Sequence, residues 1–291
     1  MKKSNFILTA IFFIILTLSF FACKKDKKEI IETIISAEDN STAENEFTSV
    51  FDVADDFTSN DTRTRSGNTI LPNGAIVTFT DSVFTDGNGI AFTIDFGTLK
   101  LVAPKGIYCK DGRYRSGKLS FTASKKYFEI GNVITVSASD ADKYYGGNDG
   151  TNLTQVTGTT TLTRITATSL NIDVANAKAV NDKGTVTWKS NRTITKTVDN
   201  GAGLLGDEFE LIGSASGVNR NGENFTVTID VPLYKKIQLG CARTFVKGKI
   251  TLTNTTSNKT IKIDYDPYNN VACDAVAKAT INNKEYYYTV R

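Results

Sequence analysis

Residues 225–233 read FTVTIDVPL, with an apolar side chain at every odd position and threonine, aspartate or proline between. Successive side chains of a β-strand point to opposite faces, so this alternation predicts a strand with one buried and one solvated face. The same period continues elsewhere after residue 70, for example at Val186, Trp188, Ile194 and Val198. Continuous apolar runs separated by helical patterns, typical of parallel α/β folds, are absent. The chain therefore predicts antiparallel sheet.

The turns between strands follow from the parity of their apolar positions. Residues 209–217 are apolar or small at odd positions, as are residues 225–233, so the numbers of facing residues must add up to an even number. A three-residue loop at 220–222 satisfies this condition, with Gly222 in the left-handed region. It predicts the facing pairs Gly217–Phe225, Ala215–Val227 and Gly213–Ile229.

The last hairpin has mixed parity, because its first strand is small or apolar at odd positions and its second at even ones. A two-residue turn at Asn282-Asn283 fits, since asparagine tolerates left-handed backbone. It predicts that Ala279 faces Tyr286 and that Ala277 faces Tyr288. The hairpin over 249–263 likewise closes on residues 255–258, so consecutive local hairpins favour a meander.

A sheet with one apolar face must curl or pack against another layer. We therefore expect an all-β fold over residues 69–291, an antiparallel meander curled into a sandwich or half-closed barrel. Since no linker rich in Pro or Gly marks a boundary, one continuous domain is favoured over two sandwiches divided near residue 166.

A short N-terminal helix is expected at about 42–57, within a tether that covers residues 23–68. Ser41 to Glu44 matches a capping box, in which a hydroxyl precedes a carboxylate by three residues. Apolar residues follow at helical spacing, and the alternative is a disordered segment with a few apolar side chains. These apolar residues are Phe47, Val50, Phe51, Ala54 and Phe57.

The first residues have the layout of an export signal. Lys2 and Lys3 precede an uncharged stretch of about 17 residues, then small Ala22, Cys23 and a charged run. This layout resembles a bacterial lipoprotein signal, which implies removal of residues 1–22 and lipidation of Cys23. An uncleaved transmembrane anchor and a plain secretory signal are the alternatives, although the stretch is short for a bilayer of roughly 30 Å.

Composition excludes several functions. Without residues 1–22 the chain has 32 basic and 31 acidic residues, a net charge of +1, which gives no basis for nucleic-acid binding. The absence of histidine excludes a Ser-His-Asp triad and the usual imidazole zinc sites, so no cofactor or metal is expected. Carboxylate chemistry remains open, because glycoside hydrolysis needs only two acids. The acid pairs that share a strand face are Glu208 with Glu210 and Asp264 with Asp266.

Three cysteines follow Cys23. Extending the register of the 249–263 hairpin places Cys241 opposite Ala272, beside Cys273. We therefore predict a Cys241–Cys273 disulfide in an oxidising compartment and a lone thiol at Cys109. Three buried free thiols are the alternative.

Two segments carry a family resemblance. They are CKDGRYRSGKL at 109–119, and GSASG at 213–217 followed by NRNG at 219–222, Cys241 and Cys273-Asp274. Together they resemble a group of uncharacterised Bacteroidetes envelope lipoproteins. The resemblance implies a lipid-anchored location at the outer membrane, on its periplasmic or cell-surface face, and brings no activity with it. The group has a further cysteine upstream that this chain lacks.

Several polar and aromatic residues are candidate binding groups. The alternation of side chains places Tyr287 on the outward face of its strand. Together with three loop tyrosines and two arginines, Tyr287 is predicted to form a binding platform for a sugar or a partner protein. The other members are Tyr144, Tyr145, Tyr268, Arg113 and Arg115. An ordinary exposed turn and strand face is the simpler interpretation. The acids at 140–149 could offer oxygens to calcium, but their spacing matches no calcium loop.

These observations favour a non-enzymatic envelope lipoprotein, held on the membrane by its lipid anchor, that binds a glycan or an envelope protein or has a structural role. Two alternatives stay open. A carbohydrate-active enzyme needs two carboxyl groups facing each other across a cleft. A carrier of an apolar ligand needs an unfilled apolar cavity.

Overall fold

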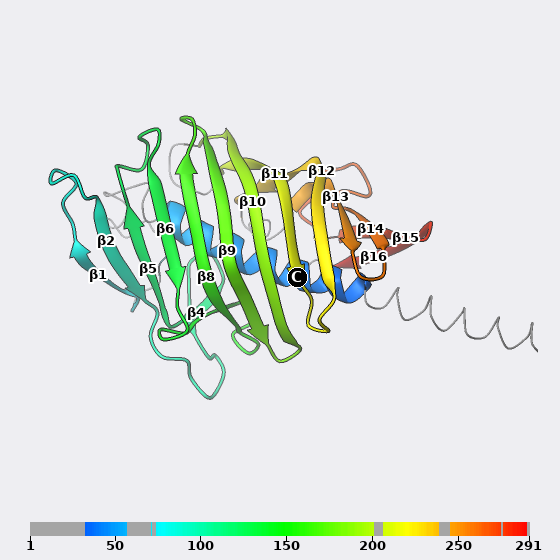
Figure 1. The fold of residues 1–291 in the computed structure, drawn as a ribbon, viewed down its shortest axis with the longest axis horizontal. Coiled ribbons are helices and arrows are strands. Elements are labelled where there is room, and N and C mark those ends of the chain that lie inside the picture. The colour runs from blue at the N-terminus through cyan, green and yellow to red at the C-terminus, as the bar shows by residue number, and fades with distance from the viewer. Residues whose placement is uncertain are drawn as a thin grey trace, which may run out of the picture.

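A computed structural model describes residues 33–56, 71, 74–200, 206–238, 245–274 and 276–289. Within these ranges the protein is one antiparallel sheet of 16 strands around a single helix, residues 33–56 (Figure 1). The strands are β1(Ile76–Asp81), β2(Ile90–Asp95), β3(Ile107–Tyr108), β4(Tyr114–Ser116), β5(Lys118–Ala123), β6(Val133–Ala138), β7(Tyr144–Gly147), β8(Thr154–Arg164), β9(Ser169–Asn181), β10(Gly184–Val198), β11(Glu208–Val218), β12(Asn224–Lys236), β13(Phe245–Asn254), β14(Lys259–Asp264), β15(Val276–Ile281) and β16(Lys284–Thr289).

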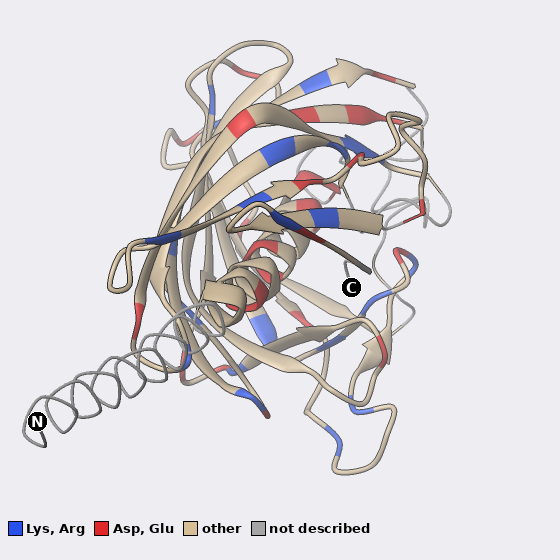
Figure 2. Ribbon diagram, turned by 90° about the vertical axis from the view of Figure 1, so that its right-hand side faces the viewer, with Lys and Arg blue, Asp and Glu red and all other residues tan. Residues whose placement is uncertain are grey.

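The sheet is a meander, as the alternation predicts. Its main path runs β1-β2-β5-β6 and then from β8 to β16 in chain order, while β3, β4 and β7 form a branch beside β8. Among the described strands the path does not close, so β1 and β16 are its two ends, and the sheet curls around the helix (Figure 2). β8 and β9 pair along their lengths, so the sheet is continuous across residue 166. The all-β antiparallel prediction is confirmed.

The predicted hairpin registers are confirmed except at one point. Gly217 faces Phe225 and Ala215 faces Val227, and Gly222 has a φ of +82° in the three-residue loop. The register then shifts between Leu211 and Ser214, where Gly213 has a φ of +127°. The predicted pair of Gly213 with Ile229 is therefore wrong, because residues 212–213 of β11 lie opposite four residues of β12, 229–232, so that β12 carries the extra residues.

The last hairpin has the predicted two-residue turn. Ala279 faces Tyr286, Ala277 faces Tyr288, and both turn asparagines, Asn282 and Asn283, have positive φ angles. In the hairpin of β13 and β14, Asn254 faces Lys259, which leaves residues 255–258 as the turn.

The helix is longer than predicted. Residue 33 is already helical, so Ser41 lies inside the helix and caps nothing. Thr42 donates its hydroxyl hydrogen bond to the carbonyl of Glu38, four residues back, as in a helix interior. The segment expected to be a polar tether up to residue 40 therefore contributes at least two turns of helix.

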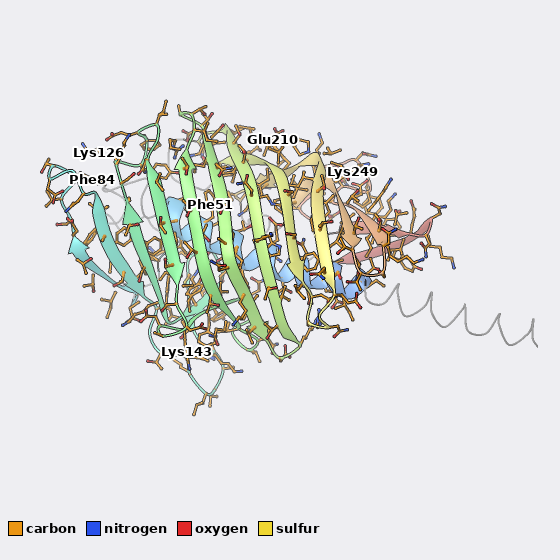
Figure 3. All side chains as sticks on the ribbon, viewed as in Figure 1. Phe51, Phe84, Lys126, Lys143, Glu210 and Lys249 are labelled. Atoms are coloured by element: carbon orange, nitrogen blue, oxygen red, sulfur yellow. The ribbon has the colours of Figure 1, made fainter. Side chains whose placement is uncertain are left out.

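The core lies between the concave face of the sheet and this helix, and Phe51 lies at its centre (Figure 3). Inward residues of the long strands, such as Leu162, Phe225 and Leu252, are fully buried against Phe47, Val50 and Phe51 of the helix. The concave face is thus filled by a helix and not by a second sheet. Within the described ranges, no helix combines the length and apolar content needed to cross a bilayer.

The strand ends form two rims. The lower rim carries the chain reversals at 97–106, 182–183, 219–223 and 255–258, which lie toward the bottom of Figure 1, and that at 282–283, which lies at its right-hand end. The upper rim carries the opposite reversals, including 124–132 between β5 and β6. Figure 3 marks the two rims with Lys143 below and Lys126 above.

Candidate functional site

The concave face of the sheet is basic where it meets the helix, and the helix is acidic (Figure 2). The basic side chains come from four strands and two loops, and most are buried. We call them the concave basic set: Arg113, Arg115, Arg164, Arg192, Lys196, Arg220 and Lys235. Of residues 33–56, only Ile34 and Glu38 are exposed, so the helix is enclosed on most of its circumference.

The middle of the helix is held by β10. Arg192 forms a buried ion pair with Glu44, at 2.5 Å between Nη2 and Oε2. Four residues earlier on the same strand face, Trp188 donates its indole N–H to Oδ1 of Asn40 at 3.0 Å. The Trp188 ring also stacks on Phe47, with 5.5 Å between ring centroids. Polar and aromatic contacts thus fix both the rotation and the position of the helix.

The branch strand β4 holds the helix from another side. Arg113 Nη2 lies 2.7 Å from Glu46 Oε1, and Arg115 Nη2 donates to the Ser49 hydroxyl at 2.7 Å. Arg115 is 0% exposed and forms a bidentate pair with Asp111. Burial alone would lower the pKa of Arg115, but the Asp111 carboxylate holds it well above its usual value. Arg115 is therefore a charged group inside the protein.

The N-terminal part of the helix is held at the lower rim. Asp39 accepts hydrogen bonds at 2.7 Å from both the backbone N–H and the Nε of Arg220 in the β11–β12 loop. Ser36 accepts hydrogen bonds from the side-chain amides of Asn219 and Asn254, at 2.9 and 3.4 Å. These contacts join residues up to 218 positions apart and place residue 36 beside two rim turns.

The other end of the helix lies toward the upper rim. Lys235 on β12 pairs with Asp52 at 3.0 Å. Burial raises the pKa of Asp55 to about 7, despite the favourable charges of Lys196 and Arg164 and with smaller contributions from Asp52 and Asp56. The charge state of Asp55 therefore changes near neutral pH.

The exposed ligand platform expected from the sequence is wrong for three of its six members. Arg113 and Arg115 are buried in the ion pairs above, and Tyr144 opens β7 with 0% exposure, where burial raises its pKa. Tyr145, next to it, is half-buried. The arginines turn inward because β4 pairs with β7 and presents them to the helix.

The two remaining members do come together. Tyr268, in the loop between β14 and β15, and Tyr287, on the edge strand β16, are both more than half exposed. Their rings stack at 5.9 Å with an interplanar angle of 14°. Tyr286 is exposed as well, at 47%. The predicted platform is thus reduced to an aromatic pair at the β16 edge.

Neither acid pair lines a cleft. Glu208 accepts a hydrogen bond from Tyr234, and Glu210 is exposed on its strand. Asp264 pairs with Lys249 at 3.0 Å, and Asp266 accepts backbone N–H groups in its own loop.

The acids considered for calcium serve local structure. Asp149 caps the backbone N–H groups of Thr151 and Asn152, and Asn148 accepts a hydrogen bond from Arg113. In the part of the chain that the structure describes, no three acids or cysteines converge as metal ligands would.

The cysteines are partly described. Cys273 is disulfide-bonded and accepts a hydrogen bond from Gln238 Nε2 at 3.1 Å. Gln238 precedes Cys241 by three residues, but Cys241 and Cys23 lie outside the described residues, so that pairing and the lipidation stay predictions. Cys109 is a free, buried cysteine, and burial raises the pKa of its thiol.

Parity could have revealed part of the concave basic set. Val186, Trp188 and Ile194 mark the even positions of β10 as inward, so Ser190 and Arg192 between them had to face inward too. Glu44, the acidic partner of Arg192, could not be found in this way, because it lies 148 residues earlier.

Comparison with known proteins adds no identification. No family model matches the chain, and neither a curated protein nor a solved structure shows significant similarity to it.

Proposed function

We propose that the protein is a lipid-anchored lipoprotein of the cell envelope with a non-enzymatic binding or structural role, in which the helix joins the anchor to the sheet. The observation that carries this proposal is the position of the helix. It is present from residue 33, ten residues after Cys23, and it is held by ion pairs from Arg113, which directly precedes β4, and from β10 and β12. A lipid chain on Cys23 would therefore hold the whole sheet through a buried element.

The ion pairs of the helix suit an element that connects the anchor to the sheet. Extracting the helix would leave several charged groups of the concave basic set buried without partners at once. Removing one partner of a single buried ion pair already costs about 3–5 kcal/mol. A tether fastened in this way does not release the sheet unless the domain unfolds.

The two alternative functions find less support in the geometry. An apolar-ligand carrier needs an unfilled cavity, and the concave face is filled by Phe47, Val50 and Phe51 of the helix. A glycosidase needs a carboxyl pair across an open cleft. The helix acids Glu44 and Glu46 instead form ion pairs with Arg192 and Arg113.

The Tyr268–Tyr287 pair is the second observation that bears on function. Stacked exposed rings offer a flat apolar face with polar hydroxyls, which suits a sugar ring or a partner surface. The binding role of the lipoprotein is therefore assigned to the β16 edge, with a glycan or an envelope protein as the ligand.

Acylation is tested by labelling cells with a fatty-acid analogue. We expect the label on the wild-type protein and on Cys109→Ser, and none on Cys23→Ser, with the wild type in the outer-membrane fraction. Label retained by Cys23→Ser would rule out the anchor.

Binding is tested on a glycan array with the purified protein. Tyr268→Ala and Tyr287→Ala should each weaken any signal, whereas Tyr286→Ala should change it little, because Tyr286 is exposed on the same strand but outside the stacked pair. A signal that survives both substitutions would place binding elsewhere.

A further inference from the structure

The loop between β2 and β3 exposes apolar side chains at its tip. Leu101 is 97% exposed and Val102 is 77% exposed, the two highest values among the large apolar side chains that the structure describes. The loop projects below the strand ends at the lower rim, in the colours between cyan and green (Figure 1). Two adjacent aliphatic side chains held in water at a projecting tip call for a partner that covers them.

The loop is held firmly at its base. The backbone N–H of Lys100 donates to the carbonyl of Lys105 at 2.8 Å, which closes the loop. The N–H of Lys105 donates to the carbonyl of Gly150 at 2.8 Å, and Pro104 packs over Gly150. The exposure of Leu101 and Val102 is therefore a property of an ordered loop and not of a fraying end.

The surroundings of the tip are basic and aromatic. Lys100 and Lys105 flank it, and the sequence from residue 96 to residue 110 contains no acid. Tyr108, at the base of the loop, is 59% exposed and packs its ring on Tyr114 at 4.9 Å. An aliphatic tip with lysines and tyrosine behind it matches the layers of a bilayer interface: acyl chains, anionic headgroups, then water.

The helix approaches the same rim. Residue 36 contacts the rim residues Asn219 and Asn254, so the chain enters the fold on the side from which the loop projects. Nine residues lie between Cys23 and residue 33, and the ten steps from one to the other can span at most about 35 Å. An anchor at Cys23 would therefore keep this rim close to the membrane.

We propose that the loop at 97–106 is a membrane-contact loop, which inserts Leu101 and Val102 into the interface of an anionic bilayer. Lys100 and Lys105 then meet the lipid phosphates, and Tyr108 lies at headgroup depth. Together with the anchor, the loop gives the domain a second contact and hence a fixed orientation on the membrane. The inference depends on the proposed lipid anchor only for bringing the rim to the bilayer.

The test uses the acylated full-length protein in vesicles of phosphatidylcholine with a minority of phosphatidylglycerol. A polarity-sensitive fluorophore is attached to Leu101→Cys or, as a matched control, to Ile130→Cys on the upper rim, where Ile130 is 65% exposed. We expect blue-shifted emission and quenching by lipid-borne quenchers at position 101 and water-like emission at position 130. The wild-type protein serves as the control for labelling of its own cysteines.

Two further variants test the chemistry. Leu101→Cys with Val102→Asp should lose most of the blue shift, because a charge would have to enter the apolar layer. Leu101→Cys with Lys100→Gln and Lys105→Gln should lose it mainly in anionic vesicles. A blue shift of equal size in purely neutral vesicles would contradict the role of the lysines.

The possible outcomes test the membrane-contact loop and the lipid anchor independently. Protein that floats with the vesicles but keeps water-like emission at position 101 overturns the membrane-contact loop and leaves the anchor standing. Protein that does not float overturns the anchor. Shielding of position 101 that requires an added envelope protein would assign the loop to a protein partner and overturn the inference.

Discussion

At the scale of single residues, the unusual feature is charge in the interior. Arg115 and Arg192 are almost fully buried, and each keeps a carboxylate within ion-pair distance. Moving a charge from water into a protein is expensive, and the attraction between partners offsets the cost only when the geometry is good. Such pairs fix which surfaces meet more than they add to stability.

Arg192→Met tests the central pair. It leaves Glu44 buried without a partner, so we expect the free energy of unfolding in urea to fall by about 3–5 kcal/mol. Lys278→Met, which removes the exposed pair with Glu285, should change it little.

The double variant Glu44→Leu with Arg192→Met removes both charges. Because Arg192 leaves Nε and Nη1 without hydrogen-bond partners, we expect the double variant to recover most of the loss. A double variant as unstable as the single one would contradict an origin in the unpaired charge.

Asp55 gives the protein a pH dependence near neutrality. Its pKa in the fold is about 7 against 3.8 in the unfolded chain, so the folded state keeps a proton that the unfolded state has released. Stability should therefore fall as the pH rises from about 4 to 7, at up to roughly 1.4 kcal/mol per unit. Asp55→Asn should flatten this slope and raise stability at pH 8 more than at pH 5, measured by urea unfolding at both pH values.

Asp149→Asn is the contrasting control. Backbone N–H groups of its turn lower the pKa of Asp149, so its contribution is present above the unfolded pKa and is lost as the pH falls. A slope between pH 4 and 7 that persists in Asp55→Asn would show that other groups cause it.

At the scale of elements, the turns are the most predictable parts of the chain. The loop at 220–222 and the turn at 282–283 follow from parity alone, because a shift by one residue would turn a whole apolar face into water. The register shift at which residues 229–232 of β12 lie opposite residues 212–213 of β11 is not contained in that pattern. Glycine in a strand signals a bulge or a close approach, and proline in a strand is confined to edges and bulges. Gly213 and Pro232 lie at the shift, but Gly217 pairs regularly with Phe225, so residue type alone does not locate it.

Two glycines with the same backbone conformation should differ in how much stability is lost when each is replaced by alanine. Gly222 has a φ of +82° with open space around it, whereas Gly117 has a φ of +79° and lies against the backbone carbonyl of Lys143. We expect Gly222→Ala to cost about 1–2 kcal/mol, the strain of left-handed alanine. Gly117→Ala should cost clearly more, and equal changes in thermal unfolding would contradict the steric reason.

The helix was predicted only in its second half, for a physical reason. Phe47, Val50, Phe51 and Ala54 form an apolar stripe, which is a local signal. The first half buries Ser36, Asp39 and Asn40, whose partners lie on distant strands. A helix that buries polar residues against polar residues has no amphipathic period to detect.

At the scale of the whole molecule, a disulfide adds a covalent link to the hydrogen-bonded pairing of neighbouring strands. Cys273 is bridged, and Gln238 beside it places the end of β12 near the β14–β15 loop. We expect mass spectrometry without reductant to find Cys241 linked to Cys273. In the chain-entropy model, closing the loop contributes roughly 3–4 kcal/mol, lost on reduction.

Cys109 is the internal control in that experiment. Its thiol is buried with a raised pKa, so an alkylating reagent should reach it only in denaturant. A peptide linking Cys273 to Cys109 would contradict the structure, and one linking it to Cys23 would exclude lipidation of that molecule.

The sequence by itself determined the all-β class, the antiparallel pairing, the parity of the inward faces and the main turns. Each of these depends on neighbours in the chain, because the strand period and the turn conformations are local properties. The same parity argument places Arg192 on the inward face of its strand, so the sequence also predicts a charged side chain in the core.

Only the tertiary structure decided what fills the sheet. The helix takes the place of a second sheet because its acids meet basic residues on strands that follow 67 to 183 residues later, as in the pairs of Glu46 with Arg113 and Asp52 with Lys235. Complementary charges that lie this far apart in the chain produce no periodic pattern in the sequence. It becomes visible when the curl of the sheet brings the concave basic set around residues 33–56.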